Sequence, residues 1–106
     1  MALFSFRRKS IDDYVAEARG QKDALLLDVR NKDEYAAGHI EGSVNIPLAD
    51  LQFSVGKLGG DLDRPIYVYC LSGARADTAT RILSQMGYTK AVSIGGIKSW
   101  KGDIVR

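Results

Sequence analysis

Ala24-Leu25-Leu26-Leu27-Asp28-Val29 is an apolar run that is interrupted only by Asp28 and bounded by charged residues. The run is too short for a helix of ordinary length, and its apolar residues are continuous rather than alternating. A strand of this kind is buried on both faces, as in parallel sheets that helices cover on both sides. Residues 66–69, Ile-Tyr-Val-Tyr, form a second run of the same kind. The two runs predict an α/β fold with a mainly parallel central sheet.

Helical and extended patterns alternate along the rest of the chain. Ser10 is expected to cap a helix that ends at Gly20, and a shorter helix is expected between the cap Asn31 and the stop Gly38. The order of elements predicts a three-layer domain with helices on both faces of the sheet. The remaining expected elements are helices over residues 48–51, 76–86 and 97–101, strands over 44–46 and 91–94, and a turn at Gly95-Gly96.

Length and composition favour one soluble domain. The chain has 106 residues, of which 45% are hydrophobic and 26% charged, and its formal net charge is +2. This balance argues against disorder, and the lack of a dense basic stripe argues against nucleic-acid binding. The first residues do not fit a secretory signal, and no apolar stretch is long enough to span a membrane. We expect an N-terminal arm over residues 1–9, a domain over residues 10–106 and a cytoplasmic location.

The only cysteine directly follows the second apolar strand and opens the segment Cys70-Leu71-Ser72-Gly73-Ala74-Arg75. In a parallel sheet, sites form at the carboxyl ends of strands, in the connection to the next helix. A tight turn at Gly73 would aim backbone N–H groups at the thiol, and the following helix and Arg75 would add positive charge. These features favour the thiolate and predict a nucleophile in an anion-binding cradle. The alternative is a buried cysteine that only fills the core.

Three parts of the sequence resemble the motifs of rhodanese-like domains. Residues 27–30 (LDVR), 34–35 (EY) and 38–47 (GHIEGSVNIP) are similar to the N-terminal signature of that family. Residues 69–75 (YCLSGAR) resemble its active-site loop, and residues 95–100 (GGIKSW) resemble its closing segment. The resemblance covers nearly the whole chain and implies a central parallel sheet flanked by helices.

The resemblance implies a sulfurtransferase in which Cys70 is the catalytic residue and residues 71–75 bind the sulfur donor. Cys70 would attack the outer sulfur of thiosulfate or another persulfide donor and hold that sulfur as a persulfide. Cyanide, a cellular thiol or a protein would then accept it. No metal or organic cofactor is implied. Because the chain has a single cysteine, the acceptor must come from outside.

The length of the loop and its side chains indicate which reactions and which sulfur donors this site would accept. Phosphatases on this fold place five residues between cysteine and arginine, whereas four residues separate Cys70 from Arg75. The loop therefore argues against a phosphatase or an arsenate reductase. Some thiosulfate-using members of the family carry basic residues at the positions of Leu71 and Ser72 and near Glu34. Fewer cations here should weaken the capture of a doubly charged donor, which leaves a protein or an apolar thiol as the alternative donor.

Four further residues are expected to support the site. Asp28 would accept backbone N–H groups and Arg30 would pair with Glu34 or Asp33, although Asp28 and Arg30 could instead line the site. His39 is expected to be a turn residue that bonds the backbone rather than a general base. A second hypothesis treats the chain as a rhodanese-like binding or sulfur-relay module that acts only inside a complex.

Overall fold

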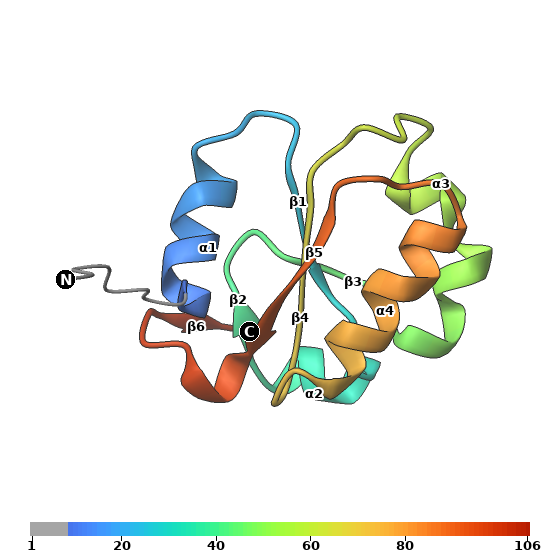
Figure 1. Ribbon diagram of the computed structural model, residues 1–106. Coiled ribbons are helices and arrows are strands. Elements are labelled where there is room, and N and C mark those ends of the chain that lie inside the picture. Colours follow the sequence, from blue (N-terminus) through green and yellow to red (C-terminus); the bar gives the residue numbers. More distant parts are fainter. Residues whose placement is uncertain (1–8) are drawn as a thin grey trace, which may run out of the picture.

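A four-stranded parallel sheet forms the centre of the structure, a computed structural model that describes residues 9–106 (Figure 1). The strands lie in the order β3 (Val44–Asn45), β1 (Leu25–Asp28), β4 (Ile66–Cys70) and β5 (Ala91–Gly96), and each neighbouring pair is parallel. The two apolar runs are β1 and β4, which lie side by side in the middle of the sheet. The predicted α/β fold with a mainly parallel sheet is confirmed.

Helices cover both faces of this sheet (Figure 1). α1 (Ile11–Arg19) packs on one face. α4 (Ala74–Gln85) packs on the other face, next to the 3₁₀ helix η1 (Leu48–Phe53) and the single turn α3 (Val55–Leu58). α2 (Lys32–Ala37) follows β1 at the carboxyl end of the strands. The three-layer arrangement expected from the order of elements is present.

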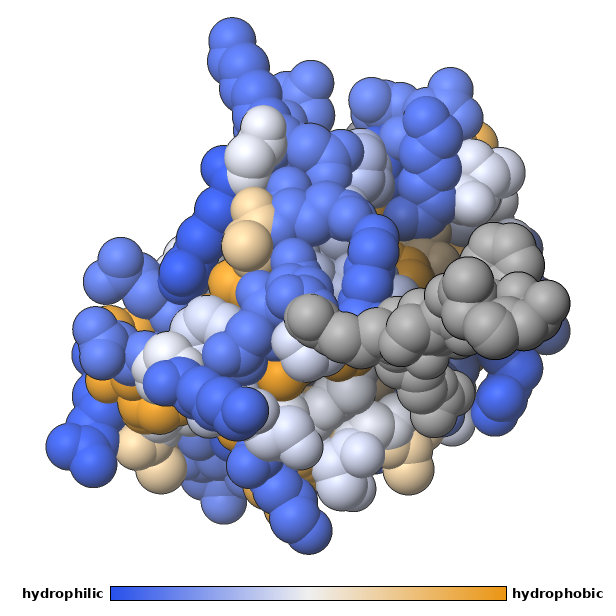
Figure 2. Space-filling view, turned by 60° about the vertical axis from the view of Figure 1, so that its left-hand side comes forward, coloured by the Kyte–Doolittle hydropathy of each residue, from blue (hydrophilic) through white to orange (hydrophobic). Residues whose placement is uncertain are grey.

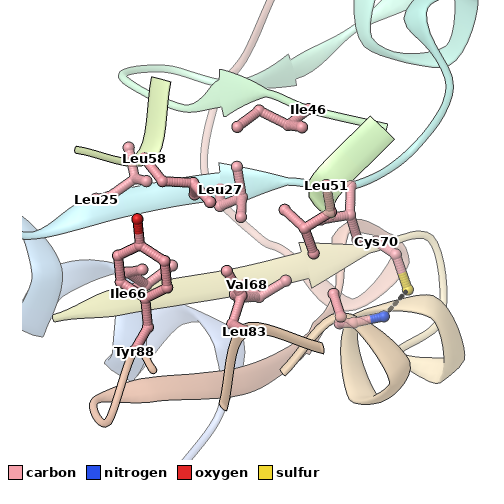
Figure 3. Close-up of a cluster of buried hydrophobic side chains, with 13 residues drawn as sticks. Leu25, Leu27, Ile46, Leu51, Leu58, Ile66, Val68, Cys70, Leu83 and Tyr88 are labelled. Carbon is pink, nitrogen blue, oxygen red and sulfur yellow. Dashed lines mark hydrogen bonds between the residues drawn. The ribbon is translucent and has the colours of Figure 1, made fainter. Parts of the chain in front are cut away.

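Side chains of the two central strands alternate between two hydrophobic clusters, one under each helical layer. Leu27 and Val68 belong to the cluster under α4, which Figure 3 shows, and Leu26 and Tyr67 belong to the cluster under α1. All four side chains are buried. Burial of one large aliphatic side chain contributes about 1.5–3 kcal/mol, so both faces of β1 and β4 stabilise the sheet. Cys70 is the last residue of the first cluster along β4.

The first two helices begin and end where the sequence predicts. Ser10 Oγ accepts the N–H of Asp13 at 3.1 Å, and the Asp13 carboxylate accepts the N–H of Ser10 at 3.1 Å. This reciprocal pair satisfies two donors that the start of α1 leaves free, and Gly20 ends the helix. α2 likewise lies between its cap Asn31 and its stop Gly38.

The N-terminal arm expected over residues 1–9 is described only at its last residue, and residues 1–8 lie outside the described part of the chain. Lys9 Nζ donates to Glu17 Oε1 at 2.6 Å and lies 5.2 Å from the centroid of the Tyr14 ring. Lys9 therefore packs on α1.

The surface on the α1 side of the molecule is mostly hydrophilic, and its apolar side chains form small separate areas (Figure 2). Among residues 9–106, no helix is long and apolar enough to cross a membrane.

Residues 95–101 differ from the prediction. Gly95 and Gly96 belong to β5 rather than to a turn, and the expected helix over 97–101 is only a 3₁₀ turn, η2 (Ile97–Ser99). The register between β4 and β5 shifts at this point, so that Tyr69 pairs with Gly95. Gly95 lies at this shift in register and has a φ of +104°, a conformation that glycine adopts without strain.

The shortest elements are not predicted by the sequence pattern. β2 (His39–Ile40) and β6 (Ile104–Val105) form a separate antiparallel pair, and α3 follows η1 directly. Two-residue strands have no periodicity to detect, and only the pairing of segments far apart in the chain creates them.

A buried polar cluster closes the carboxyl end of β1 and β4. The Tyr69 hydroxyl accepts the N–H of Ile40 at 3.1 Å and lies 3.0 Å from Ser43 Oγ. Because Ser43 Oγ donates to the Ile40 carbonyl oxygen at 2.7 Å, the Tyr69 hydroxyl is the donor to Ser43. Burial raises the pKa of the Tyr69 phenol, so the group stays protonated and can serve as this donor.

Tyr69→Phe should therefore lower the free energy of unfolding by about 1–3 kcal/mol, because the buried N–H of Ile40 and Oγ of Ser43 lose a partner. Denaturant unfolding measures the change. Tyr14→Phe is the matched control, since no hydrogen bond of the Tyr14 hydroxyl occurs within residues 9–106. Equal stability losses in both variants would contradict the assigned role of the cluster.

Candidate active site

The sulfur of Cys70 lies at the end of β4, where two backbone N–H groups point at it. Sγ accepts the N–H of Gly73 at 3.0 Å and the N–H of Ala76 at 3.4 Å. In Figure 3 the dashed line at the sulfur marks the longer of these two bonds, and Cys70 lies at the edge of the hydrophobic cluster. Cys70 is 1% exposed, so the sulfur is held in a cradle of amides rather than on the surface.

The start of α4 explains this cradle. Gly73 has a φ of +113°, which turns the chain sharply and makes it the residue before the first helical position. α4 therefore begins at Ala74, two residues earlier than predicted, and Ala76 is its third residue. The N–H groups of the first turn have no partner within a helix, and here the sulfur accepts two of the amides at this end. The positive end of the helix dipole also favours a negative charge on the sulfur.

Ala76 is not among the site residues that the sequence predicts. An alanine has no side-chain chemistry, and only its position in α4 gives its N–H a role. Gly73 was the available signal, because a glycine placed as the helix cap puts Ala76 in the first turn.

The loop rests on the bulged end of β5. A Cβ at Gly96 would overlap the carbonyl oxygen of Leu71, and that oxygen also accepts the N–H of Lys98 at 3.2 Å. The close approach of Leu71 to Gly96 explains why a residue without a side chain stands there. Leu71 itself is 46% exposed at the rim.

Arg75 lies in the first turn of α4 rather than at the end of a loop, and it forms an ion pair with Glu34 of α2. The distances are 2.7 Å from Nη1 to Oε1 and 3.1 Å from Nη2 to Oε2, so both carboxylate oxygens are engaged. The N–H of Asn31 also donates to Glu34 Oε1 at 3.0 Å. The Arg75 hydrogen bonds hold the pKa of Glu34 at about 2, and those same bonds raise the pKa of Arg75.

The expected partner of Arg30 was wrong. Arg30 forms a two-pronged ion pair with Asp28, with Nη2 at 2.8 Å from Oδ2, and not with Glu34 or Asp33. Asp28 Oδ1 also accepts the N–H of Arg30 at 2.9 Å, as expected for a carboxylate that bonds the backbone. Only Val29 separates the partners, and the bend at the end of β1 lets the longer side chain fold back. Both residues are buried, so this pair is a structural feature of the sheet edge.

His39 bonds the backbone as predicted, but it lies in β2 rather than in a turn. Its Nδ1 is 2.8 Å from the Tyr35 carbonyl oxygen, which can only accept, so Nδ1 carries a proton. The imidazole stacks on the Tyr35 ring with centroids 3.6 Å apart. These contacts join β2 to α2 and give His39 a structural role.

A cavity of about 590 Å³ borders the loop on the side of β5 and α1. Its wall includes Ser72 and Gly73 of the loop and carries charged groups of both signs, Lys9 and Asp77. The other lining residues are Tyr14, Ala74, Ser93, Ile94 and Gly95. A small molecule or an extended peptide could therefore lie beside the amides that surround the sulfur.

Of the residues predicted for the site, the structure gathers residues 70–75 and Glu34 at the carboxyl end of the sheet. Asp28 and Arg30 lie at the same edge as a closed pair, and His39 contacts α2.

The family model of the rhodanese-like domain matches residues 12–103 of the chain.

The chain belongs to the rhodanese-like family.

Relatives and solved structures agree with this assignment. The chain is 36% identical to thiosulfate sulfurtransferase PspE of Escherichia coli over 72 residues. These residues are 68% of this chain and 69% of PspE. It is 37% identical over 86 residues to the uncharacterized protein YqhL of Bacillus subtilis, covering 80% of the chain and 67% of YqhL. A solved structure of a rhodanese with anions from E. coli superposes with a TM-score of 0.72 at 32% identity, over 78% of this chain and 98% of that chain.

In this rhodanese-like chain, Gly96→Ala should displace the loop and lower the free energy of unfolding by about 1–3 kcal/mol, because the new methyl group overlaps the Leu71 carbonyl oxygen. Thermal or denaturant unfolding measures the loss. Gly56→Ala in α3 is the control, since a Cβ there meets no atom within 4 Å. The packing of the loop on β5 is disproved if Gly96→Ala is as stable as Gly56→Ala.

The ion pair predicts a pH effect. The pKa of Glu34 is lowered from 4.5 to about 2, so its contribution to stability is complete above about pH 4.5 and is lost as the pH falls toward 2. Arg75→Gln should move the Glu34 pKa back toward 4.5, as measured by NMR titration of the side-chain carboxyl. Arg81→Gln, in the exposed part of α4, should leave that pKa unchanged. A Glu34 pKa that is insensitive to Arg75→Gln would rule out the ion pair as its cause.

Proposed function

We propose that this chain is a sulfurtransferase that carries a sulfane sulfur on Cys70. The observation that carries the proposal is the pair of amide N–H groups that converge on Sγ. Amide donors at a helix start stabilise a thiolate and any anion that later hangs from the sulfur. The similarity to a protein named thiosulfate sulfurtransferase supports the same chemistry.

In the first half-reaction, the thiolate of Cys70 attacks the outer sulfur of the donor. With thiosulfate, a bond forms between Sγ and that sulfur, the bond between the two donor sulfurs breaks, and sulfite leaves with the electron pair. Cys70 then holds a persulfide anion. No electrons enter or leave the overall step, so no redox cofactor takes part.

In the second half-reaction, a nucleophile takes the outer sulfur. Cyanide would attack it to form thiocyanate, and a thiol would form a new persulfide, while the electron pair of the broken bond returns to Sγ. Cys70 is the single cysteine of the chain, so the acceptor is an external molecule or protein. Such a thiol-based cycle suits a reducing compartment, and we assign the chain to the cytoplasm on that ground.

The burial of Cys70 favours one alternative, a module that loads and unloads sulfur only when bound to another protein. Cys70 is 1% exposed, and the neighbouring Leu71 offers an apolar contact at the rim. A partner that displaces Leu71 would open the path to the sulfur. Under this alternative the isolated chain would not react with small donors.

Incubation with thiosulfate should add one sulfur atom to the protein, cyanide should remove it, and Cys70→Ser should never gain it. Intact-protein mass spectrometry measures each step. Circular dichroism confirms that the serine variant is folded, so that its lack of sulfur reflects chemistry.

Two other outcomes would contradict the proposed sulfurtransferase function. Sulfur that is gained equally by Cys70→Ser would exclude Cys70 as the carrier. A folded wild-type protein that gains no sulfur from thiosulfate or from an organic persulfide would refute the catalytic proposal and favour the relay module.

A further inference from the structure

The cation beside the sulfur cradle is already engaged by a carboxylate. α2 and the start of α4 lie next to each other at the carboxyl end of the strands, where Glu34 meets Arg75 (Figure 1). Two parallel contacts, at 2.7 and 3.1 Å, fill the guanidinium fork. Among residues 9–106, the hydrogen bonds of the Arg75 guanidinium go to Glu34 alone. One two-pronged face of the guanidinium, formed by Nη1 and Nη2, is therefore occupied, and the carboxylate balances the charge of Arg75.

Glu34 is held in this position by its own helix. It is the third residue of α2, and its Oε1 accepts the N–H of Asn31 at 3.0 Å. The carboxylate is thus held by its own helix as well as by Arg75, and its lowered pKa, caused mainly by the Arg75 hydrogen bonds, reflects the strength of this pair. An incoming donor must compete with a preorganised ion pair for the guanidinium.

Other cations at this edge do not replace Arg75. Arg30 is buried and paired with Asp28, and Lys9, in the wall of the cavity beside the loop, is paired with Glu17. Lys98 reaches the loop through its backbone N–H, and its side chain is exposed to solvent, where its charge is screened. The electrostatic field at the cradle is therefore supplied mainly by backbone amides.

We propose that Glu34 is a specificity-determining residue that neutralises Arg75, so that the site loads sulfur from organic persulfides with an uncharged body in preference to dianionic thiosulfate. The proposal rests on the sulfurtransferase function proposed above. Amide N–H groups can receive one sulfur atom with little charge, whereas the sulfonate end of thiosulfate needs a free cation. The exposed Leu71 at the rim suits the apolar body of such a donor.

The loading step balances for this class of donor. The Cys70 thiolate attacks the outer sulfur of R–S–SH, a bond forms between Sγ and that sulfur, and the S–S bond of the donor breaks. R–S⁻ leaves with the electron pair, and Cys70–S–SH keeps the proton. No oxidant or reductant is consumed.

The test measures single-turnover loading of Cys70 by rapid-quench mass spectrometry, with thiosulfate and with 2-hydroxyethyl persulfide, a donor with an uncharged body. Glu34→Gln keeps the shape of the side chain but weakens its hold on Arg75. We expect the apparent second-order rate constant with thiosulfate to rise roughly three- to tenfold, the size of effect that one partly exposed charge produces. The rate constant with the persulfide should stay within about twofold of the wild-type value.

Asp33→Asn is the matched control, because it changes the net charge by the same amount on the same helix and Asp33 is exposed. It should leave both rate constants within about twofold of the wild type. A similar change with both donors in Glu34→Gln would mean that Glu34 only supports the loop, and would overturn the proposal. An equal gain with thiosulfate in Asp33→Asn would assign the effect to general surface charge and overturn it as well. Wild-type protein that loads from neither donor would instead refute the sulfurtransferase function itself.

Discussion

Two backbone N–H groups that converge on one sulfur atom are the constraint on which the rest of the site depends. Gly73 and Ala76 can both reach Sγ only because the chain leaves β4 in a tight left-handed turn and enters α4 at once. This turn also depends on β5. Because Gly96 has no side chain, the Leu71 carbonyl can lie directly against that strand. The cradle is therefore a property of two neighbouring parallel strands and the helix between them.

Charge at the carboxyl edge of the sheet is arranged in closed pairs. Asp28 with Arg30 and Glu34 with Arg75 each place an arginine against a carboxylate of the same edge. The first pair is buried and holds the end of β1, while the second is partly exposed next to the sulfur. The dipole of α4 and the peptide amides at its start add positive potential at the sulfur.

Much of this architecture follows from the sequence. The continuous apolar side chains at residues 25–27 and 66–69 are removed from water only if both faces of each strand are buried. A parallel sheet between helical layers provides this burial. Ser10, Gly20, Asn31 and Gly38 mark helix ends by local chemistry, so their roles needed no tertiary information. The position of Cys70 after a central strand, with Gly73 three residues later, indicates a nucleophile in a turn.

Tertiary structure alone decided which partners meet. Arg30 pairs with Asp28, two positions away, and Glu34 pairs with Arg75. The bend after β1 and the position of α2 beside the start of α4 set these distances. The antiparallel pair of β2 and β6 joins residues more than sixty positions apart, and Gly95-Gly96 became a bulged strand end because a loop packs on it. The sequence by itself determined the central strands, the caps of the first two helices and the place of the thiol, since these depend on local periodicity and backbone preference. The pairing of charges and the approach of the loop to β5 depend on distances that only the folded chain defines.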